Sequence, residues 1–252
     1  MRHMILIGGG EIGGPCPPKG LLKTPFETLP IDSFFVSLIK KDKPKLLFLP
    51  TATEERDPTR GYEKAVRNYF HGRFGMQVDS LYLIQEHPSY PEIKQKISST
   101  DCIYIGGGDT KALVDAWNNT GATPLIKDAI FSGKPVAGVS AGAICWFEMG
   151  ISNYRRIRYG EKDMAPVEGL GILKGYAIAH YHREENVLSQ IEKIIPKGTK
   201  KVCWGIDDFA ALYIKGNKKT GLFSNENSGI YKISSHKSVI REQIVFSGRN
   251  ER

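Results

Sequence analysis

Residues 135–143 read Pro135-Val136-Ala137-Gly138-Val139-Ser140-Ala141-Gly142-Ala143, an apolar run that passes through Gly-x-Ser-x-Gly into small helix-forming residues. This pattern is typical of a strand that turns sharply into a helix and carries a nucleophilic serine on the turn. Glycines flanking Ser140 leave no side chains to clash, so the hydroxyl can project above the strand end. The stretch predicts an α/β fold with Ser140 as nucleophile; the alternative is an ordinary serine on a small-residue turn.

The alternation of short apolar runs with longer amphipathic stretches extends outward from this turn along most of the chain. Expected strands cover residues 4–7, 45–49, 77–84, 102–105, 135–139, 177–179 and 201–204. Expected helices cover residues 31–39, 59–74, 90–98, 110–118, 123–132, 141–147 and 184–195. Such alternation is typical of a parallel sheet with crossover helices. We therefore predict a doubly wound, mostly parallel α/β sheet.

Length and composition favour one domain over residues 1–252, because 252 residues with 40% hydrophobic content supply a single large core. From about Ala210 the pattern changes to shorter strands with turn residues, which predicts an antiparallel extension of the sheet. Residues 13–30 contain five prolines and are expected to form a surface loop near the strand ends.

Charge and cysteine content narrow the class of protein. The formal net charge is +8, but lysines and arginines are spread along the chain, so we expect a solvated surface and no nucleic-acid partner. The sequence shows neither a signal peptide nor a membrane span. Four widely spaced cysteines without a CxxC motif fit a reducing cytoplasm and give no metal site.

A second turn ends another apolar strand, in Ile105-Gly106-Gly107-Gly108-Asp109-Thr110. If this strand neighbours the one before Ser140, the backbone N–H groups of Gly108 and Ala141 can form an oxyanion hole. The alternative is a dinucleotide or phosphate loop, but the turn lacks both GxGxxG and the lysine of a phosphate loop.

A serine hydroxyl needs a base to take its proton, so a histidine must lie nearby in the fold. Among six histidines, His180 and His182 directly follow the apolar strand Tyr176-Ala177-Ile178-Ala179. Active groups on open α/β sheets lie at the carboxyl ends of strands. We therefore predict His180 as the base, with His182 second.

With these motifs in place, the chain resembles the peptidase E-like serine peptidases, which include aspartyl dipeptidase and the cyanophycinases. The resemblance covers most of residues 1–215. It rests on Gly8-Gly9-Gly10-Glu11-Ile12, Phe48-Leu49-Pro50-Thr51-Ala52-Thr53, Gly106-Gly107-Gly108-Asp109-Thr110, Gly138-Val139-Ser140-Ala141-Gly142-Ala143-Ile144-Cys145-Trp146-Phe147, Ala179-His180-Tyr181 and Gly205-Ile206-Asp207-Asp208.

The resemblance implies a class I glutamine amidotransferase-like (flavodoxin-like) three-layer sandwich and a cofactor-free serine peptidase. It implies Ser140 as nucleophile, His180 as base, and Gly108 and Ala141 as oxyanion donors. The expected oxyanion and substrate-binding residues are Gly107, Gly108, Asp109, Ala141 and Arg183.

The third member of the family's triad is usually an acidic residue about a dozen positions after the nucleophile. Here that stretch reads Ile151-Ser152-Asn153-Tyr154. An amide can orient a histidine but offers an imidazolium no negative charge. We rank Asn153 first as the orienting residue and Asp208 second, with Asp207 and Glu184 as further candidates.

The expected substrate is a short peptide, with an amino-terminal Asp as the leading hypothesis by resemblance to aspartyl dipeptidases. Four arginines lie close in sequence to the predicted site and could bind an acidic substrate: Arg155, Arg156, Arg158 and Arg183. The alternative is that they are surface charges with no fixed partner.

A catalytically weak binding protein remains the second hypothesis for function. Cys145 is expected to be a buried helix residue rather than a nucleophile. The expected state is a monomer or homodimer.

Overall fold

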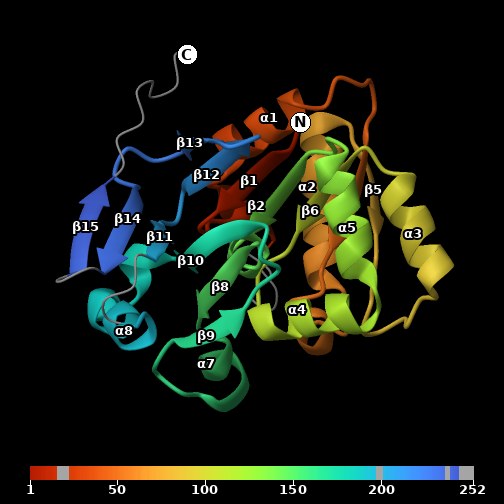
Figure 1. Ribbon diagram of the computed structural model, residues 1–252. Helices are drawn as coiled ribbons and strands as arrows, with labels where there is room; N and C mark the ends of the chain where they lie inside the picture. Colours follow the sequence, from red (N-terminus) through yellow and green to blue (C-terminus); the bar gives the residue numbers. More distant parts are fainter. Residues whose placement is uncertain (16–22, 197–200, 236–238, 244–252) are drawn as a thin grey trace.

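The first sheet carries the strand that precedes Ser140. The computed structural model describes residues 1–15, 23–196, 201–235 and 239–243. Its strand order is β13-β12-β1-β7-β6-β4-β5, with β1, β7, β6, β4 and β5 parallel and β12 and β13 antiparallel (Figure 1). The bounds are β1 His3–Ile7, β4 Lys45–Leu49, β5 Gln77–Ser80, β6 Cys102–Ile105, β7 Val136–Val139, β12 Ala210–Lys215 and β13 Lys218–Phe223.

Helices cover both faces of this sheet and so produce three layers. On one face lie α1 (Leu29–Ser37) and α2 (Gly61–Phe74), and on the other lie α3 (Tyr90–Ser98), α4 (Thr110–Asn119) and α5 (Ala122–Phe131). Successive strand residues point to opposite faces. In β1, Ile5 and Ile7 pack with α1 and α2, whereas Met4 and Leu6 pack with the other helices. Burial on both faces explains why the central strands are uninterrupted apolar runs.

A second sheet lies beside the first. Its order is β15-β14-β11-β10-β8-β9, in which β8, β10 and β11 are parallel. The bounds are β8 Phe147–Ser152, β9 Ala165–Glu168, β10 Leu173–Ala179, β11 Val202–Ile206, β14 Ile230–Ser235 and β15 Val239–Gln243. Its inner face, including Ala177, Ala179 and Ile206, joins the core of the first sheet. Its outer face packs against helix α8 (Val187–Ile194).

The predicted mostly parallel α/β arrangement is present, but its strands form two large sheets where one was expected. Residues 177–179 and 201–204 were expected in the main sheet, but they belong to β10 and β11 of the second sheet. The antiparallel strands expected after Ala210 are present, and they extend both sheets: β12 and β13 the first, β14 and β15 the second. Local patterns mark strands but do not say which partner a strand finds.

Two expected elements end early. The helix expected over residues 141–147 is only α6 (Ala141–Ile144), because Phe147 already begins β8 and pairs with β10. The strand expected over residues 77–84 ends at Ser80. Beyond it, the buried carboxylate of Glu54, in the short helix η1 (Glu54–Arg56), accepts hydrogen bonds from the amides of Leu83, Ile84 and Gln85. These bonds replace the ladder that a longer strand needs.

The proline-rich stretch at residues 13–30 was expected to be a surface loop. Instead β2 (Ile12–Pro15) and β3 (Lys23–Phe26) form an antiparallel hairpin, and α1 begins at Leu29. Residues 16–22, with Cys16, lie outside the described residues. The remaining short helices are α7 (Tyr154–Tyr159) and η2 (Tyr181–Arg183). Across the described residues, every helix is too short or too polar to cross a bilayer.

Asp32 is a buried carboxyl group on the inner face of α1. One of its oxygens accepts hydrogen bonds from the Thr28 hydroxyl at 2.7 Å and the Tyr69 hydroxyl at 2.9 Å. The other oxygen, Oδ1, has no partner among the described residues. Burial raises the pKa of Asp32 to about 7, although both hydrogen bonds act in the opposite direction. The folded protein therefore retains this proton at a pH where the unfolded chain releases it.

We expect Asp32 to make the stability of the protein depend on pH. A raised carboxyl pKa gives stability that is complete below the unfolded pKa and is lost as pH rises towards the folded pKa near 7. Between pH 5 and pH 8, Asp32 should lower the free energy of unfolding by about 3 kcal/mol. Urea unfolding of Asp32→Asn should lack this component, whereas the exposed Asp42→Asn should retain it. Parallel pH profiles for all three proteins would contradict the prediction.

Candidate active site

Ser140 occupies the turn between β7 and α6 with a backbone conformation unusual for a non-glycine residue. Its φ is 53° and its ψ is −109°. The Ser140 N–H donates to the Ile7 carbonyl at 2.9 Å, which ties the turn to β1. A Cβ at Gly138 would lie 2.1 Å from the Gly142 carbonyl oxygen, so the turn can close only around glycine. Such strained turns are held by their surroundings and concentrate at functional sites.

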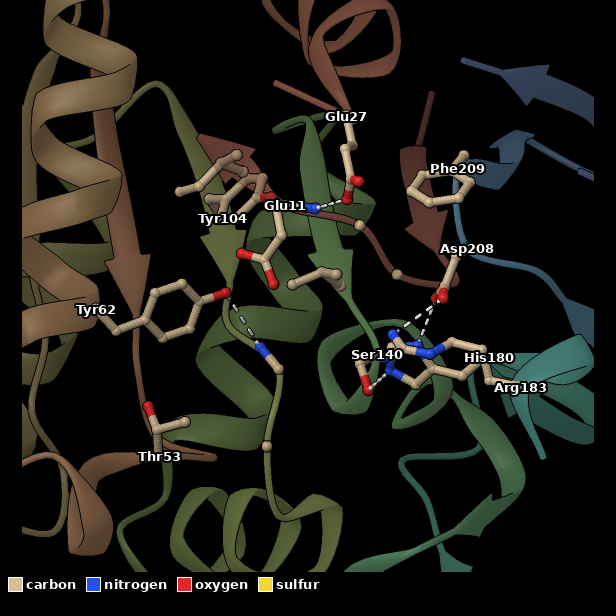
Figure 2. Close-up of a pocket in the computed structure, with 16 residues that line it drawn as sticks. Glu11, Glu27, Thr53, Tyr62, Tyr104, Ser140, His180, Arg183, Asp208 and Phe209 are labelled. Atoms are coloured by element: carbon tan, nitrogen blue, oxygen red, sulfur yellow. Dashed lines mark hydrogen bonds and ion pairs between the residues drawn. The ribbon is translucent and has the colours of Figure 1, made fainter. Parts of the chain in front are cut away.

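His180 and Asp208 complete a hydrogen-bonded chain with Ser140 (Figure 2). His180 follows β10, and its Nε2 lies 2.9 Å from the Ser140 Oγ. Asp208 follows β11, and its Oδ1 lies 2.5 Å from the His180 Nδ1. All three residues follow the carboxyl ends of parallel strands. The first sheet supplies Ser140 and the second supplies His180 and Asp208, so the site lies where the two sheets meet.

The surroundings of Asp208 favour its charged form. Burial is the largest single influence and opposes ionisation, but the hydrogen bonds and positive charges of His180 and Arg183 together outweigh it. The pKa of Asp208 is therefore lowered below its usual value. The Arg183 guanidinium donates to the second carboxylate oxygen at 3.1 Å. An ionised Asp208 accepts the Nδ1 proton of His180, and this tautomer leaves Nε2 able to take the Ser140 proton.

The ranking of Asn153 above Asp208 is corrected by this geometry. Asn153 precedes α7 and lines a narrow cleft that also touches Ser140 and His180. Among the described residues, no hydrogen bond joins Asn153 to His180, because Asp208 already occupies the Nδ1 side of the ring. Glu184 is likewise engaged elsewhere, in an ion pair with Arg156 at 2.9 Å.

A second histidine–aspartate pair lies directly beside the first. The His182 Nδ1 lies 2.8 Å from the Asp207 Oδ2, and Asp207 also accepts the backbone amides of His182 at 3.1 Å and Gly229 at 2.8 Å. The His182 ring therefore faces Asp207 rather than Ser140. This pair fixes the loop after β11, and it excludes His182, the second choice of base, from the site.

Gly9 permits the close approach of the segment after β1 to the histidine–aspartate pair. A Cβ at Gly9 would lie 2.0 Å from the Asp208 Oδ1 and 2.5 Å from the His180 ring. Gly9 also forms an isolated parallel bridge with Asp208. The sequence contained this glycine only as part of a family-like motif, and its contact with the site became visible in the fold.

The glycine turn after β6 lies beside Ser140, because β6 and β7 are neighbouring strands. Gly107 and Gly108 line the same cavity as Ser140. The Gly107 amide donates to the Tyr62 hydroxyl at 3.4 Å. In the described part of the chain, the amides of Gly108 and Ala141 have no acceptor. These two N–H groups are thus available to an oxyanion formed next to Ser140.

Asp109 has a structural task instead of the expected place at the substrate. Its buried carboxylate caps α4 by accepting the Ala112 amide at 2.9 Å. The second oxygen forms an ion pair with Arg158. Asp109 does not line the cavity. Its contacts with α4 and Arg158 instead hold the end of the glycine turn in place.

The cavity in front of Ser140 has a volume of about 720 Å³. From the residues described above, the lining contains Gly9, Gly107, Gly108, Ser140, His180, Arg183 and Asp208. It also contains several residues that sequence reasoning missed: Glu11, Glu27, Thr53, Tyr62, Tyr104 and Phe209. Glu11 follows the glycines at the carboxyl end of β1, a position that signals a site residue in this class of fold. Glu27 and Tyr62 carry no comparable sequence signal, because only the fold brings them here.

Comparison with known proteins fits this site. The sequence matches peptidase family S51 over residues 20–222. The chain belongs to peptidase family S51. This S51 chain is 28% identical over 215 residues to the uncharacterized peptidase YgaJ of Bacillus subtilis (strain 168), covering 84% of this chain and 83% of YgaJ.

Solved structures related to this S51 chain share its fold. A peptidase from an acI-B1 actinobacterium has a TM-score of 0.68 at 21% identity, covering 98% of this chain and 96% of that one. A candidate peptidase E from Listeria monocytogenes EGD-e has a TM-score of 0.65 at 21% identity, covering 88% and 98%. The expected class I glutamine amidotransferase-like fold is thereby confirmed, and so is the resemblance to peptidase E. The chain is a serine-type peptidase.

Proposed function

We propose that this S51 peptidase hydrolyses short peptides through an acyl-enzyme on Ser140. The observation that carries the proposal is the hydrogen-bonded chain from Ser140 through His180 to the ionised Asp208. A serine activated by a histidine, which is itself oriented by a carboxylate, is the arrangement that acyl transfer requires.

Each residue then has one task in the reaction. The Ser140 Oγ attacks the peptide carbonyl while the His180 Nε2 takes its proton, and Asp208 stabilises the resulting imidazolium. The amides of Gly108 and Ala141 stabilise the oxyanion of the tetrahedral intermediate. His180 then protonates the leaving amine, and water activated by the same ring hydrolyses the ester on Ser140.

The cavity dimensions support a small substrate. A volume of about 720 Å³ suits a ligand of a few residues and lies within the usual range of small-molecule sites. We therefore expect peptides of two or three residues to be cleaved faster than longer ones.

The preference for an amino-terminal Asp stays a prediction, and the contacts of the four arginines do not support it. Arg183 is the one member of this group that lines the cavity, and it pairs with Asp208. The others form ion pairs outside the cavity: Arg155 with Glu161, Arg156 with Glu184 and Arg158 with Asp109. Each of these four arginines has a carboxylate partner within the protein.

The second hypothesis, a catalytically weak binding protein, is also no longer supported by the observation that suggested it. It rested on an amide at Asn153 in place of an acid, whereas a carboxylate, Asp208, lies at the orienting position.

The proposed mechanism is tested by trapping Ser140. A fluorophosphonate should phosphonylate the protein once, and peptide mapping by mass spectrometry should place the adduct on Ser140. Iodoacetamide should leave peptide hydrolysis intact, because Cys145 is buried and burial raises the pKa of its thiol far above the usual value. Absence of labelling, or loss of activity on alkylation that substrate prevents, would overturn the proposal.

We also propose that the protein acts in the cytoplasm as a monomer or homodimer, without a nucleic-acid partner. Cys102, Cys145 and Cys203 are buried and unpaired, which suits a reducing compartment. Cell fractionation tests the location, and light scattering after size-exclusion chromatography tests the assembly.

A further inference from the structure

Glu11 projects a carboxylate into the cavity that contains Ser140. Figure 2 shows it in the space between Tyr62 and Ser140, and it is one of the lining residues. In the described part of the chain, this carboxylate has neither an ion-pair partner nor a hydrogen-bond donor. It is therefore available to a ligand.

Glu27 holds Glu11 in this position. The Glu11 amide donates to the Glu27 Oε2 at 2.9 Å, and the Glu27 amide donates to the Glu11 carbonyl at 2.8 Å. This reciprocal pair fixes the Glu11 backbone while its side chain remains directed into the cavity. Glu27 lines the same cavity and brings a second negative charge.

The charges of the cavity do not balance. Its charged lining residues are Glu11, Glu27, Asp208 and Arg183, besides His180. Arg183 is committed to Asp208, so the two glutamates have no compensating cation among the described residues. A locally acidic cavity is notable in a chain whose formal net charge is +8. Charges of one sign in a cleft attract ligands of the opposite sign.

Aromatic side chains lie beside the two glutamates. Tyr104 and Tyr62 contribute to the cavity lining, and the Tyr104 hydroxyl is buried without a hydrogen-bond partner in the described part of the chain. Burial, reinforced by the charge of Glu11, raises the pKa of the nearby Tyr62 to about 12, so that phenol also stays neutral. Neutral hydroxyls and aromatic rings beside carboxylates are suitable surroundings for an ammonium or guanidinium group.

We propose that the cavity selects peptides with a positive charge on the acyl residue, and that Glu11 binds this charge. The inference rests on the proposed function. The positive charge is assigned to the acyl residue because Gly108, an oxyanion donor in the proposed mechanism, lines the same cavity as Glu11. The cation is the free α-ammonium group or a basic side chain of that residue.

The two sources of the cation are separated by a panel of anilides. The panel contains Lys, Arg, Ala and Asp p-nitroanilides and their N-acetyl derivatives. If the α-ammonium is bound, N-acetylation lowers kcat/KM at least 10-fold for every residue. If the side chain is bound, N-acetyl-Lys and N-acetyl-Arg anilides remain good substrates while the Ala anilide is poor. Equal rates across the panel would overturn the inference, and so would an Asp anilide that is cleaved fastest whether or not its amino group is acetylated.

Glu11→Gln tests the residue while keeping its size. For the preferred cationic substrate, kcat/KM should fall about 10- to 100-fold, the usual range for loss of a charged hydrogen bond. The best N-acetylated neutral substrate should change less than 3-fold. Glu192→Gln removes the same charge from the exposed surface of α8 and should leave both values unchanged. An equal loss on charged and neutral substrates would show a structural role and overturn the assignment of Glu11.

Fluorophosphonate labelling separates this inference from the proposed function. If Ser140 is labelled in the wild type and in Glu11→Gln but no cation preference appears, the inference fails and the proposed mechanism stands. If neither labelling nor turnover occurs, both fail. Protection of Ser140 from labelling by lysinamide or alaninamide, but not by N-acetylalaninamide, should be lost in Glu11→Gln.

Discussion

Ser140→Ala is expected to lower kcat for peptide hydrolysis by about 10⁶-fold, as removal of the nucleophile does in well-studied serine peptidases. The acyl-enzyme cannot form without the Oγ, and neither His180 nor the free amides of Gly108 and Ala141 can replace it. The cost to folding should be small, because Ser140 is tied to β1 through its backbone N–H and not through its side chain. Initial rates on dipeptide substrates at saturating concentration measure the effect.

The matched control is Ser33→Ala, which removes an exposed hydroxyl from α1 far from the cavity. It should retain full turnover, and both variants should unfold at nearly the wild-type temperature. Retention of more than about 1% of the activity in Ser140→Ala would mean that the measured hydrolysis does not pass through this serine. The residual rate, where detectable, would report binding and oxyanion stabilisation alone.

Local signals explain why Ser140 and His180 could be predicted from the sequence. Glycine spacing, an apolar strand and a helix start surround Ser140 within nine residues, and His180 directly follows an apolar strand. These features depend on the steric requirements of a single turn, and residues adjacent in the sequence determine those requirements. The first sheet, with helices on both faces, could be predicted for the same reason, because each buried strand carries its own apolar run.

The orienting carboxylate and the acidic lining depend on contacts between segments that are distant in the chain. Asp208 reaches His180 because β11 pairs beside β10 in the second sheet, a pairing that the sequence pattern did not indicate. Glu27 reaches Glu11 through the hairpin of β2 and β3, where a surface loop was expected. The sequence contains both carboxylate residues, Asp208 and Glu27, but the pairing of the strands determines which residues they contact.

Asp208→Asn is expected to lower kcat by about 10⁴-fold, whereas Asn153→Ala should change it less than about 10-fold. An asparagine keeps the size of Asp208 but cannot offer the imidazolium a negative charge and can favour the wrong tautomer of His180; the acid-to-amide change in a well-studied serine protease has this magnitude. Among the described residues, no hydrogen bond joins Asn153 to the His180 ring, so replacing its amide should affect catalysis much less. Steady-state rates for both variants on one substrate give the comparison.

The pH dependence of the two variants adds a readout that a structural defect would not produce. Because His180 and Arg183 lower the pKa of Asp208, the wild type keeps its carboxylate ionised below the usual carboxyl range. The wild-type acid limb should therefore not report protonation of Asp208. Without the carboxylate the imidazolium is less stable, so the acid limb of Asp208→Asn should move to lower pH while that of Asn153→Ala stays in place. A large loss in Asn153→Ala with an unchanged Asp208→Asn would instead assign the orienting role to the amide at the family's usual position, and the observed Asp208 contact would then serve only to hold β11 against β1.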